Sequence, residues 1–73
     1  MSQPLRVSAR NQLRGVVEEI RVDGLLAQVR LRVGNDVITA VVTRDAVEEL
    51  GLAKGQEALA LIKSTEVLLG RVG

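Results

Sequence analysis

The chain has 73 residues, ten of them basic and nine acidic, which is enough for one domain with a net charge of +1. It contains no Cys and no His, which excludes disulfide staples and soft or imidazole metal sites. It also contains no aromatic residue, although 47% of residues are hydrophobic, so the core must be built from aliphatic side chains.

The small size of the chain predicts an assembly. A domain of this length buries only roughly 60% of its unfolded surface. With no disulfide or metal to stabilise it, such a domain gains stability by oligomerising. We therefore expect a homo-oligomer in which residues 1–73 form a single domain and residues 1–6 are a loose tail.

The distribution of apolar residues also predicts a location. Residues 1–10 lack the apolar core of a signal peptide. No apolar run reaches the length that spans a bilayer. We therefore predict a cytoplasmic protein without a membrane partner.

Hydrophobic patterning predicts five strands and one helix. The strands are expected over residues 13–22, 27–33, 37–42, 58–62 and 67–72. The helix is expected over residues 44–50, where Ala46, Val47 and Leu50 recur at helical spacing. The order βββαββ with short turns is typical of a five-stranded OB-like barrel, which is an all-β fold with one short helix.

Turn signals and polarity refine the strand predictions. The expected turns are Asp23-Gly24, Gly34-Asn35 and Lys54-Gly55. Residues 27–33 alternate between apolar and polar with a period of two, which predicts one buried face and one wet face. Residues 37–42 are apolar on both faces apart from Thr39, so one face of this strand should meet another subunit. Gly15 indicates a bend in the first strand.

Two residues compete for the N-cap of the helix. Thr43 is one candidate, and Asp45 is the other. Asp45 and Glu48 have the spacing of a capping box, with Asp in place of Ser or Thr. Gly51 stands where a glycine ends a helix, and Leu52 can supply the hydrophobic contact of a Schellman motif.

Paired carboxylates do not predict an enzyme here. Glu18 and Glu19 are neighbours on a strand and are expected to face opposite sides. Glu48 and Glu49 are expected to form a solvated helix face. No Cys or His can act as nucleophile or base, and no serine lies in a Gly-x-Ser-x-Gly elbow. The sequence therefore predicts a protein that is not an enzyme.

Two short stretches combine hydroxyls, cations and backbone N–H groups beside predicted strands. The first is Ser8-Ala9-Arg10-Asn11, which runs into Gln12-Leu13 at the first strand, and the second is Ile62-Lys63-Ser64-Thr65-Glu66-Val67, at the end of the fourth. Either stretch alone is compatible with an ordinary solvated loop. Together they offer many donors and few acceptors. That combination suits a small oxyanion, because charged donors form short, strong hydrogen bonds with anions.

These two stretches resemble those of the molbindin (Mop) family of small molybdate-binding proteins, whose domain is related to TOBE domains. The resemblance covers residues 7–72 and implies a molybdate or tungstate site lined by both stretches. It also adds Thr43, because the family has a threonine there that contacts molybdate. A helix N-terminus favours an anion, whereas the alternative role of Thr43 is a plain N-cap. The implied site residues are Ser8, Ala9, Arg10, Thr43, Lys63 and Ser64.

The resemblance has further implications for assembly and role. It implies a hexamer, organised as a trimer of dimers, with oxyanion sites at the subunit interfaces. The bound ligand would be molybdate or tungstate, with no organic cofactor and no metal coordinated directly by side chains. The implied role is storage or homeostasis of the oxyanion in the cytoplasm.

Two other functions stay open at this point. An accessory or regulatory domain that senses an oxyanion for a transporter or a regulator could use the same site. A nucleic-acid-binding OB module would stack bases on aromatic rings and attract the backbone with positive charge. The chain has no such rings and is nearly neutral, so we expect no nucleic-acid partner.

Overall fold

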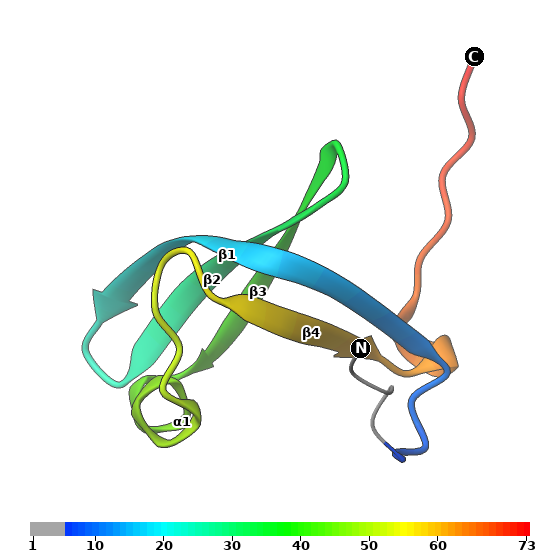
Figure 1. Cartoon of the computed structure of the whole chain (residues 1–73). Helices are drawn as coiled ribbons and strands as arrows, with labels where there is room; N and C mark the ends of the chain where they lie inside the picture. The colour runs from blue at the N-terminus through cyan, green and yellow to red at the C-terminus, as the bar shows by residue number, and fades with distance from the viewer. Residues whose placement is uncertain (1–5) are drawn as a thin grey trace.

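The computed structural model describes residues 6–73, so most of the predicted loose tail, residues 1–6, lies outside the described residues. Four antiparallel strands form one curled sheet in the order β3-β2-β1-β4 (Figure 1). The elements in chain order are β1 (Asn11–Asp23), β2 (Leu26–Val33), β3 (Asp36–Thr43), α1 (Arg44–Leu50), β4 (Glu57–Ile62) and the 3-10 turn η1 (Ser64–Glu66).

The aliphatic core lies on the concave face of the sheet. Val17 in β1 is only 1% exposed and packs with Val29 and Leu31 of β2. Ala27 is also buried, so the predicted alternation along residues 27–33 is confirmed as far as Leu31. The buried cluster is therefore built from aliphatic side chains alone.

Glycine turns join the first three strands as expected. Gly24 and Gly34 have φ angles of 62° and 60°, which is the left-handed conformation that tight hairpin turns favour. The pairs Asp23 with Leu26 and Val33 with Asp36 close the two hairpins. Both turn predictions are therefore confirmed.

A β-bulge at Glu18 bends β1. Val17 lies opposite Leu31 and Glu19 lies opposite Arg30, so Glu18 is the extra residue of β1. A bulge increases the local twist and bends the strand. This bend helps the sheet to curl around its core.

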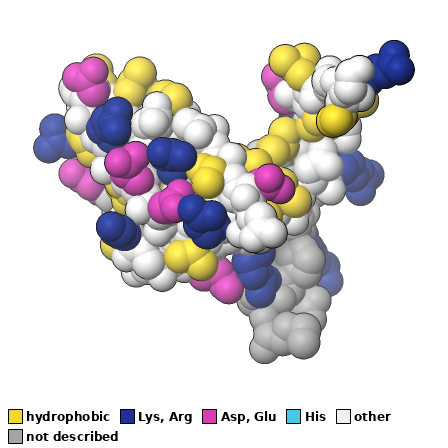
Figure 2. Space-filling model, turned by 90° about the horizontal axis from the view of Figure 1, so that it is seen from above, with side chains coloured by type: hydrophobic (Ala, Val, Ile, Leu, Met, Phe, Trp, Pro, Cys, Tyr) yellow, Lys and Arg dark blue, Asp and Glu magenta, His cyan; other side chains and the backbone are white. Residues whose placement is uncertain are grey.

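The bulge also overturns the expectation that Glu18 and Glu19 face opposite sides. Glu18 accepts a hydrogen bond from Arg32, and Glu19 lies 4.0 Å from Arg30. Arg30 and Arg32 are two residues apart on β2 and therefore share a face. The extra residue thus places both carboxylates on the outer face, where acidic and basic side chains are interspersed (Figure 2). The Arg32 guanidinium lowers the pKa of the Glu18 carboxyl below its ordinary value.

Helix α1 is capped at both ends by residues singled out from the sequence. The Ala46 N–H donates to Thr43 Oγ1 at 3.0 Å, so Thr43 is the N-cap and the Asp45 alternative is wrong. Gly51 has a φ of 63°, and the Leu52 N–H donates to the Val47 carbonyl at 3.0 Å. These contacts confirm the predicted glycine stop.

The prediction of a fifth strand over residues 67–72 is wrong. A strand needs a hydrogen-bonded neighbour, and within residues 6–73 this segment pairs with none. The segment runs away from the sheet and from α1 (Figure 1), and Leu68, Leu69 and Val72 are 93%, 94% and 99% exposed. The fold is therefore an open half-barrel of four strands and one helix, in the order βββαβ, instead of a closed five-stranded barrel.

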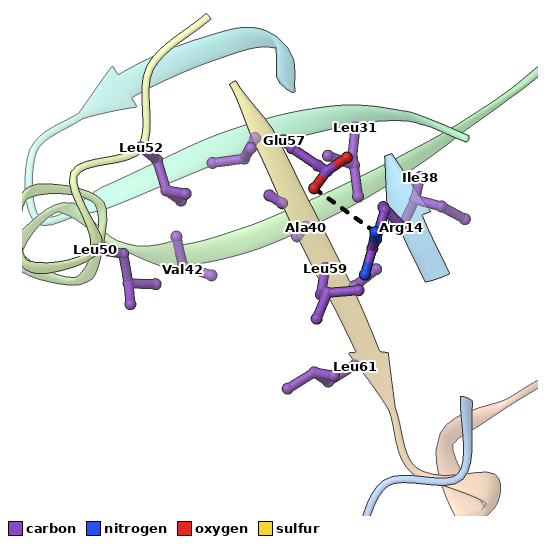
Figure 3. A pocket seen from close by; sticks show the side chains of 13 residues that line it. Arg14, Leu31, Ile38, Ala40, Val42, Leu50, Leu52, Glu57, Leu59 and Leu61 are labelled. Atoms are coloured by element: carbon purple, nitrogen blue, oxygen red, sulfur yellow. Dashed lines mark ion pairs between the residues drawn. The ribbon is translucent and has the colours of Figure 1, made fainter. Parts of the chain in front are cut away.

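The missing fifth strand leaves an open groove on the concave side, with a volume of about 560 Å³. Its walls are β3 and β4, and α1 with Leu52 closes one end (Figure 3). The lining is aliphatic except for Arg14 and Glu57, whose charged groups lie 3.9 Å apart. On the outer face of β3, Val41 stays exposed, and the expected contact of this face with another subunit remains a prediction.

Candidate anion-binding site

The pairing of β1 with β4 brings the two donor-rich stretches to the same end of the sheet. Asn11 opens β1 and lies opposite Ile62, the last residue of β4. The Asn11 side-chain amide also donates to the Ile62 carbonyl at 3.0 Å. Arg10 and Lys63 flank this pair, so the structure places one stretch beside the other.

The stretch before β1 is held by a buried alanine. Ala9 is buried, whereas Ser8 and Arg10 on either side of it are exposed. The Gln12 side-chain amide donates to the Ala9 carbonyl at 3.3 Å, which ties the loop to the strand that follows. The backbone is therefore anchored at Ala9, while the hydroxyl of Ser8 and the guanidinium of Arg10 remain accessible to a ligand.

The stretch after β4 turns sharply into η1. Lys63 is extended, with φ −65° and ψ 144°, and its carbonyl accepts a hydrogen bond from the Glu66 N–H at 2.9 Å. No side chain caps η1, so the amides of its first turn have no side-chain acceptor. Lys63 and Ser64 are exposed. This turn therefore supplies a cation and a hydroxyl beside amides suited to an anion.

The two cations at this end of the sheet lie outside the ion pairs of the described residues. Five arginines, Arg14, Arg21, Arg30, Arg32 and Arg44, lie in ion pairs. Neither Arg10 nor Lys63 forms an ion pair with any residue in the range 6–73. An incoming anion would therefore meet two cations with no internal carboxylate to displace.

Thr43 does not join the other predicted site residues within one chain. It closes β3 opposite Leu26, and the Arg44 N–H donates to the Leu25 carbonyl at 2.8 Å. These contacts place Thr43 near the far end of the 13-residue strand β1, beside α1 (Figure 1). At roughly 3.3 Å per residue, even a curled strand keeps Thr43 well away from Arg10 and Lys63. A site that uses all six residues needs more than one chain.

Sequence reasoning left two positioning residues out of the site. Asn11 and Gln12 do not extend the cation-and-hydroxyl pattern, but their amides fix the backbones at Ile62 and Ala9. The signal was available, because two consecutive amides open a strand that is otherwise rich in aliphatic residues. Their role depends on the partner strand, which the sequence alone does not identify.

The described part of the chain offers neither a cluster of metal ligands nor a membrane-spanning helix. No group of three or more acidic residues there could hold a metal ion, which fits the lack of His and Cys in the whole sequence. No helix within residues 6–73 is long and apolar enough to cross a bilayer. The donor-rich end of the β1–β4 ladder therefore remains the candidate site.

A curled open half-barrel with one capped helix and a donor-rich end defines a small OB-like β-domain. The TOBE domain matches residues 7–69. Over 66 residues the chain is 42% identical to molybdenum-pterin-binding protein 1 from Clostridium pasteurianum, with 89% of this chain and 97% of that protein covered. The chain belongs to the TOBE domain family, among its molybdenum-pterin-binding (Mop) members.

Two longer relatives contain a similar segment. Molybdenum transport protein ModE from Azotobacter vinelandii is 44% identical over 69 residues, which cover 93% of this chain and 26% of ModE. The solved structure of the cytoplasmic molybdate-binding protein ModG, with molybdate bound, superimposes with a TM-score of 0.85 at 45% identity. That match covers 90% of this chain and 48% of ModG, so this chain spans only part of both relatives.

The Thr43 hydroxyl should contribute measurably to stability as the N-cap of α1. Thr43→Val should destabilise the folded chain by roughly 0.5–2 kcal/mol, because the Ala46 N–H loses its acceptor. Thr43→Ser keeps the hydroxyl and should restore most of this stability. Urea denaturation at one protein concentration measures the difference, and equal stability of all three proteins would contradict the capping role.

Proposed function

We propose that this chain binds molybdate or tungstate as a free tetrahedral dianion and serves storage or homeostasis of that oxyanion in the cytoplasm. The observation that supports the proposal is the β1–β4 pairing of Asn11 with Ile62, which brings the two donor-rich stretches to the same end of the sheet. A small dianion is bound well by hydroxyls, backbone amides and two cations outside ion pairs, because these groups donate hydrogen bonds and positive charge. The relatives' names support the choice of molybdate.

The separation of Thr43 from the other five residues supports a site shared between subunits. We infer that Thr43 of one subunit completes a site whose other donors come from a second subunit. The proposed assembly is a homo-hexamer, a trimer of dimers, in which each chain forms one domain. The proposed protein is a passive binder without an organic cofactor or catalytic residues.

An accessory or regulatory domain is the second candidate function. The observation that favours it is the match to ModE, in which the corresponding segment is 26% of a longer protein. Such a domain would use the same anion site and pass its occupancy to a partner. A regulatory role requires that molybdate changes a surface or an assembly state, whereas storage requires only reversible binding.

Native mass spectrometry with and without molybdate tests both candidates. We expect one oligomeric state in both conditions, with added masses that correspond to whole oxyanions. Binding without a change of subunit number supports storage. A change of subunit number on binding favours the regulatory role. Absence of any bound oxyanion at saturating molybdate would reject the anion site.

Anion selectivity gives a second prediction for the site. Molybdate and tungstate should compete with similar affinity, because they have nearly the same size and charge. Phosphate should bind more weakly. A donor-rich site has no acceptor for the proton of monohydrogen phosphate, and an unsatisfied O–H costs roughly 1–3 kcal/mol. Competition calorimetry should therefore show phosphate weaker by about one to two decades.

Sulfate serves as the control in that competition, because it carries no proton and is smaller than molybdate. Weak sulfate binding would show that size contributes to selectivity beside proton recognition. Phosphate displacing molybdate at equal concentration would contradict the donor-only picture. The exposed carboxylate of Glu66, within η1, would then be the first candidate for a proton acceptor.

A further inference from the structure

The Asn11 side chain connects the two donor-rich stretches, at the point where β1 begins beside the end of β4 (Figure 1). It is half-buried, and its amide donates to the Ile62 carbonyl at 3.0 Å. The Ile62 carbonyl and the Lys63 N–H belong to one peptide unit, which is planar and trans, so they point in opposite directions. The hydrogen bond from Asn11 therefore fixes the direction of the Lys63 N–H together with that of the Ile62 carbonyl.

Gln12 has the same relation to the stretch that precedes β1. Its side-chain amide donates to the Ala9 carbonyl at 3.3 Å, and that carbonyl shares a planar peptide unit with the Arg10 N–H. Ala9 is buried, so this peptide unit is held through the Ala9 side chain as well as through its carbonyl. The two consecutive amides that open β1 thus orient one backbone N–H in each donor-rich stretch.

Both oriented N–H groups belong to the cations of the candidate site. Within residues 6–73, neither the Arg10 N–H nor the Lys63 N–H donates to a backbone carbonyl. A donor whose direction is fixed before the ligand arrives loses little freedom on binding, which increases affinity. We propose that these two N–H groups donate directly to the oxyanion, and that Asn11 and Gln12 are the positioning residues that orient them. This inference rests on the proposed function.

A carboxamide suits this task better than any charged side chain. It donates to a backbone carbonyl and brings no net charge to the site. An ionised carboxylate at position 11 or 12 could only accept hydrogen bonds, so it could not hold the carbonyl and would repel the anion. The cationic side chains then attract the dianion over a distance, whereas the oriented N–H groups determine where its oxygens lie.

An NMR titration with molybdate distinguishes positioning from general stability. In the ¹⁵N-labelled natural chain, the amide proton signals of Arg10 and Lys63 should move downfield on saturation, because each N–H gains an anionic acceptor. Asn11→Leu removes the side-chain donor at similar size. It should reduce the Lys63 shift several-fold and keep the Arg10 shift. Gln12→Leu should do the reverse.

Calorimetry measures the accompanying loss of affinity. Asn11→Leu and Gln12→Leu should each bind molybdate roughly tenfold more weakly, since one hydrogen bond to a charged group is weakened. All cations and hydroxyls of the site are kept in both variants. Gln56→Leu is the matched control, because Gln56 is an exposed carboxamide residue just before β4, at the other end of the β1–β4 ladder. It should leave the affinity and both amide shifts unchanged.

Equal reduction of both amide shifts in each variant would indicate a general loosening of the strand ends and would overturn the positioning roles. Unchanged shifts and affinities would overturn them too, and the proposed function would stand. Thermal unfolding without molybdate checks that each variant folds, and Asn11→Ala or Gln12→Ala replaces one that does not. A natural chain that binds no molybdate would reject the proposed function and this inference together.

Discussion

Gly15→Ala should destabilise the fold by roughly 1–3 kcal/mol or more, because the added methyl has no space. A Cβ at this position would lie 2.3 Å from the backbone oxygen of Arg32 and 2.9 Å from side-chain carbons of Leu31 and Val33. Real Cβ atoms do not approach a carbonyl oxygen so closely, so β1 and β2 would have to separate. In a chain this small, such a loss removes much of the total stability.

Gly70→Ala is the control for the added methyl. Gly70 has no heavy atom within 4 Å of the position of a Cβ, so the same substitution should leave the unfolding of one chain nearly unchanged. Denaturation is compared at one protein concentration, because assembly adds to apparent stability.

The contact with the Arg32 carbonyl makes a sharper test possible. Gly15→Ala/Leu31→Ala removes a side-chain clash but leaves the clash with backbone, so it should be at least as unstable as Gly15→Ala. Recovery of stability in the double variant would show that the side chain was the obstacle and that the strands can separate. The sequence indicated a bend at Gly15, whereas the structure shows a close approach of two strands.

Local signals in the sequence were sufficient for most of the fold. Alternation of polarity identified β2, glycines marked the hairpin turns, and the stop at Gly51 followed from chemistry within a few residues. The competition between Thr43 and Asp45 for the N-cap was decided only by geometry, through the hydrogen bond from Ala46. Features that depend on neighbouring residues are readable in a sequence, because the interacting groups lie within one or two turns.

The sequence did not predict features that depend on a partner strand far away along the chain. The bulge at Glu18 arises from the register between β1 and β2, and it reversed the expected sides of the two carboxylates. Residues 67–72 have the pattern of a strand, but a pattern does not state where the partner lies or whether it belongs to the same chain. The prediction of a fifth strand in this segment was therefore wrong, because within residues 6–73 it pairs with no neighbour.

In the candidate site, too, the local residue pattern was visible in the sequence, whereas the arrangement of its parts in space was not. Both donor stretches were visible as clusters of hydroxyls and cations, yet their proximity depends on the pairing of Asn11 with Ile62. Thr43 is separated from both donor stretches by the length of β1, and the sequence did not show this separation either. The ligand contacts of all six residues remain predictions.

Lys63→Ala should weaken molybdate binding by about one to two decades, with little effect on folding. Lys63 is exposed and forms no ion pair within residues 6–73, so its removal leaves the core and the ion pairs intact. A hydrogen bond to a charged group contributes roughly 1.5–3 kcal/mol, which corresponds to this loss of affinity. Calorimetry at fixed ionic strength measures it, because salt screens exposed charges.

Lys54→Ala is the matched control for Lys63→Ala. Lys54 is an exposed lysine in the turn before β4, so its removal changes the net charge equally without touching the donor-rich end. The Lys54→Ala variant should bind molybdate with an affinity within about twofold of that of the natural chain, since a distant exposed charge is screened.

Arg10→Ala should lose as much affinity as Lys63→Ala if the Arg10 guanidinium contacts the anion. It should lose almost no affinity if only the Arg10 backbone amide contacts the anion. Equal affinities for Lys63→Ala, Arg10→Ala and the natural chain would remove both side chains from the site and leave the anion to hydroxyls and backbone amides.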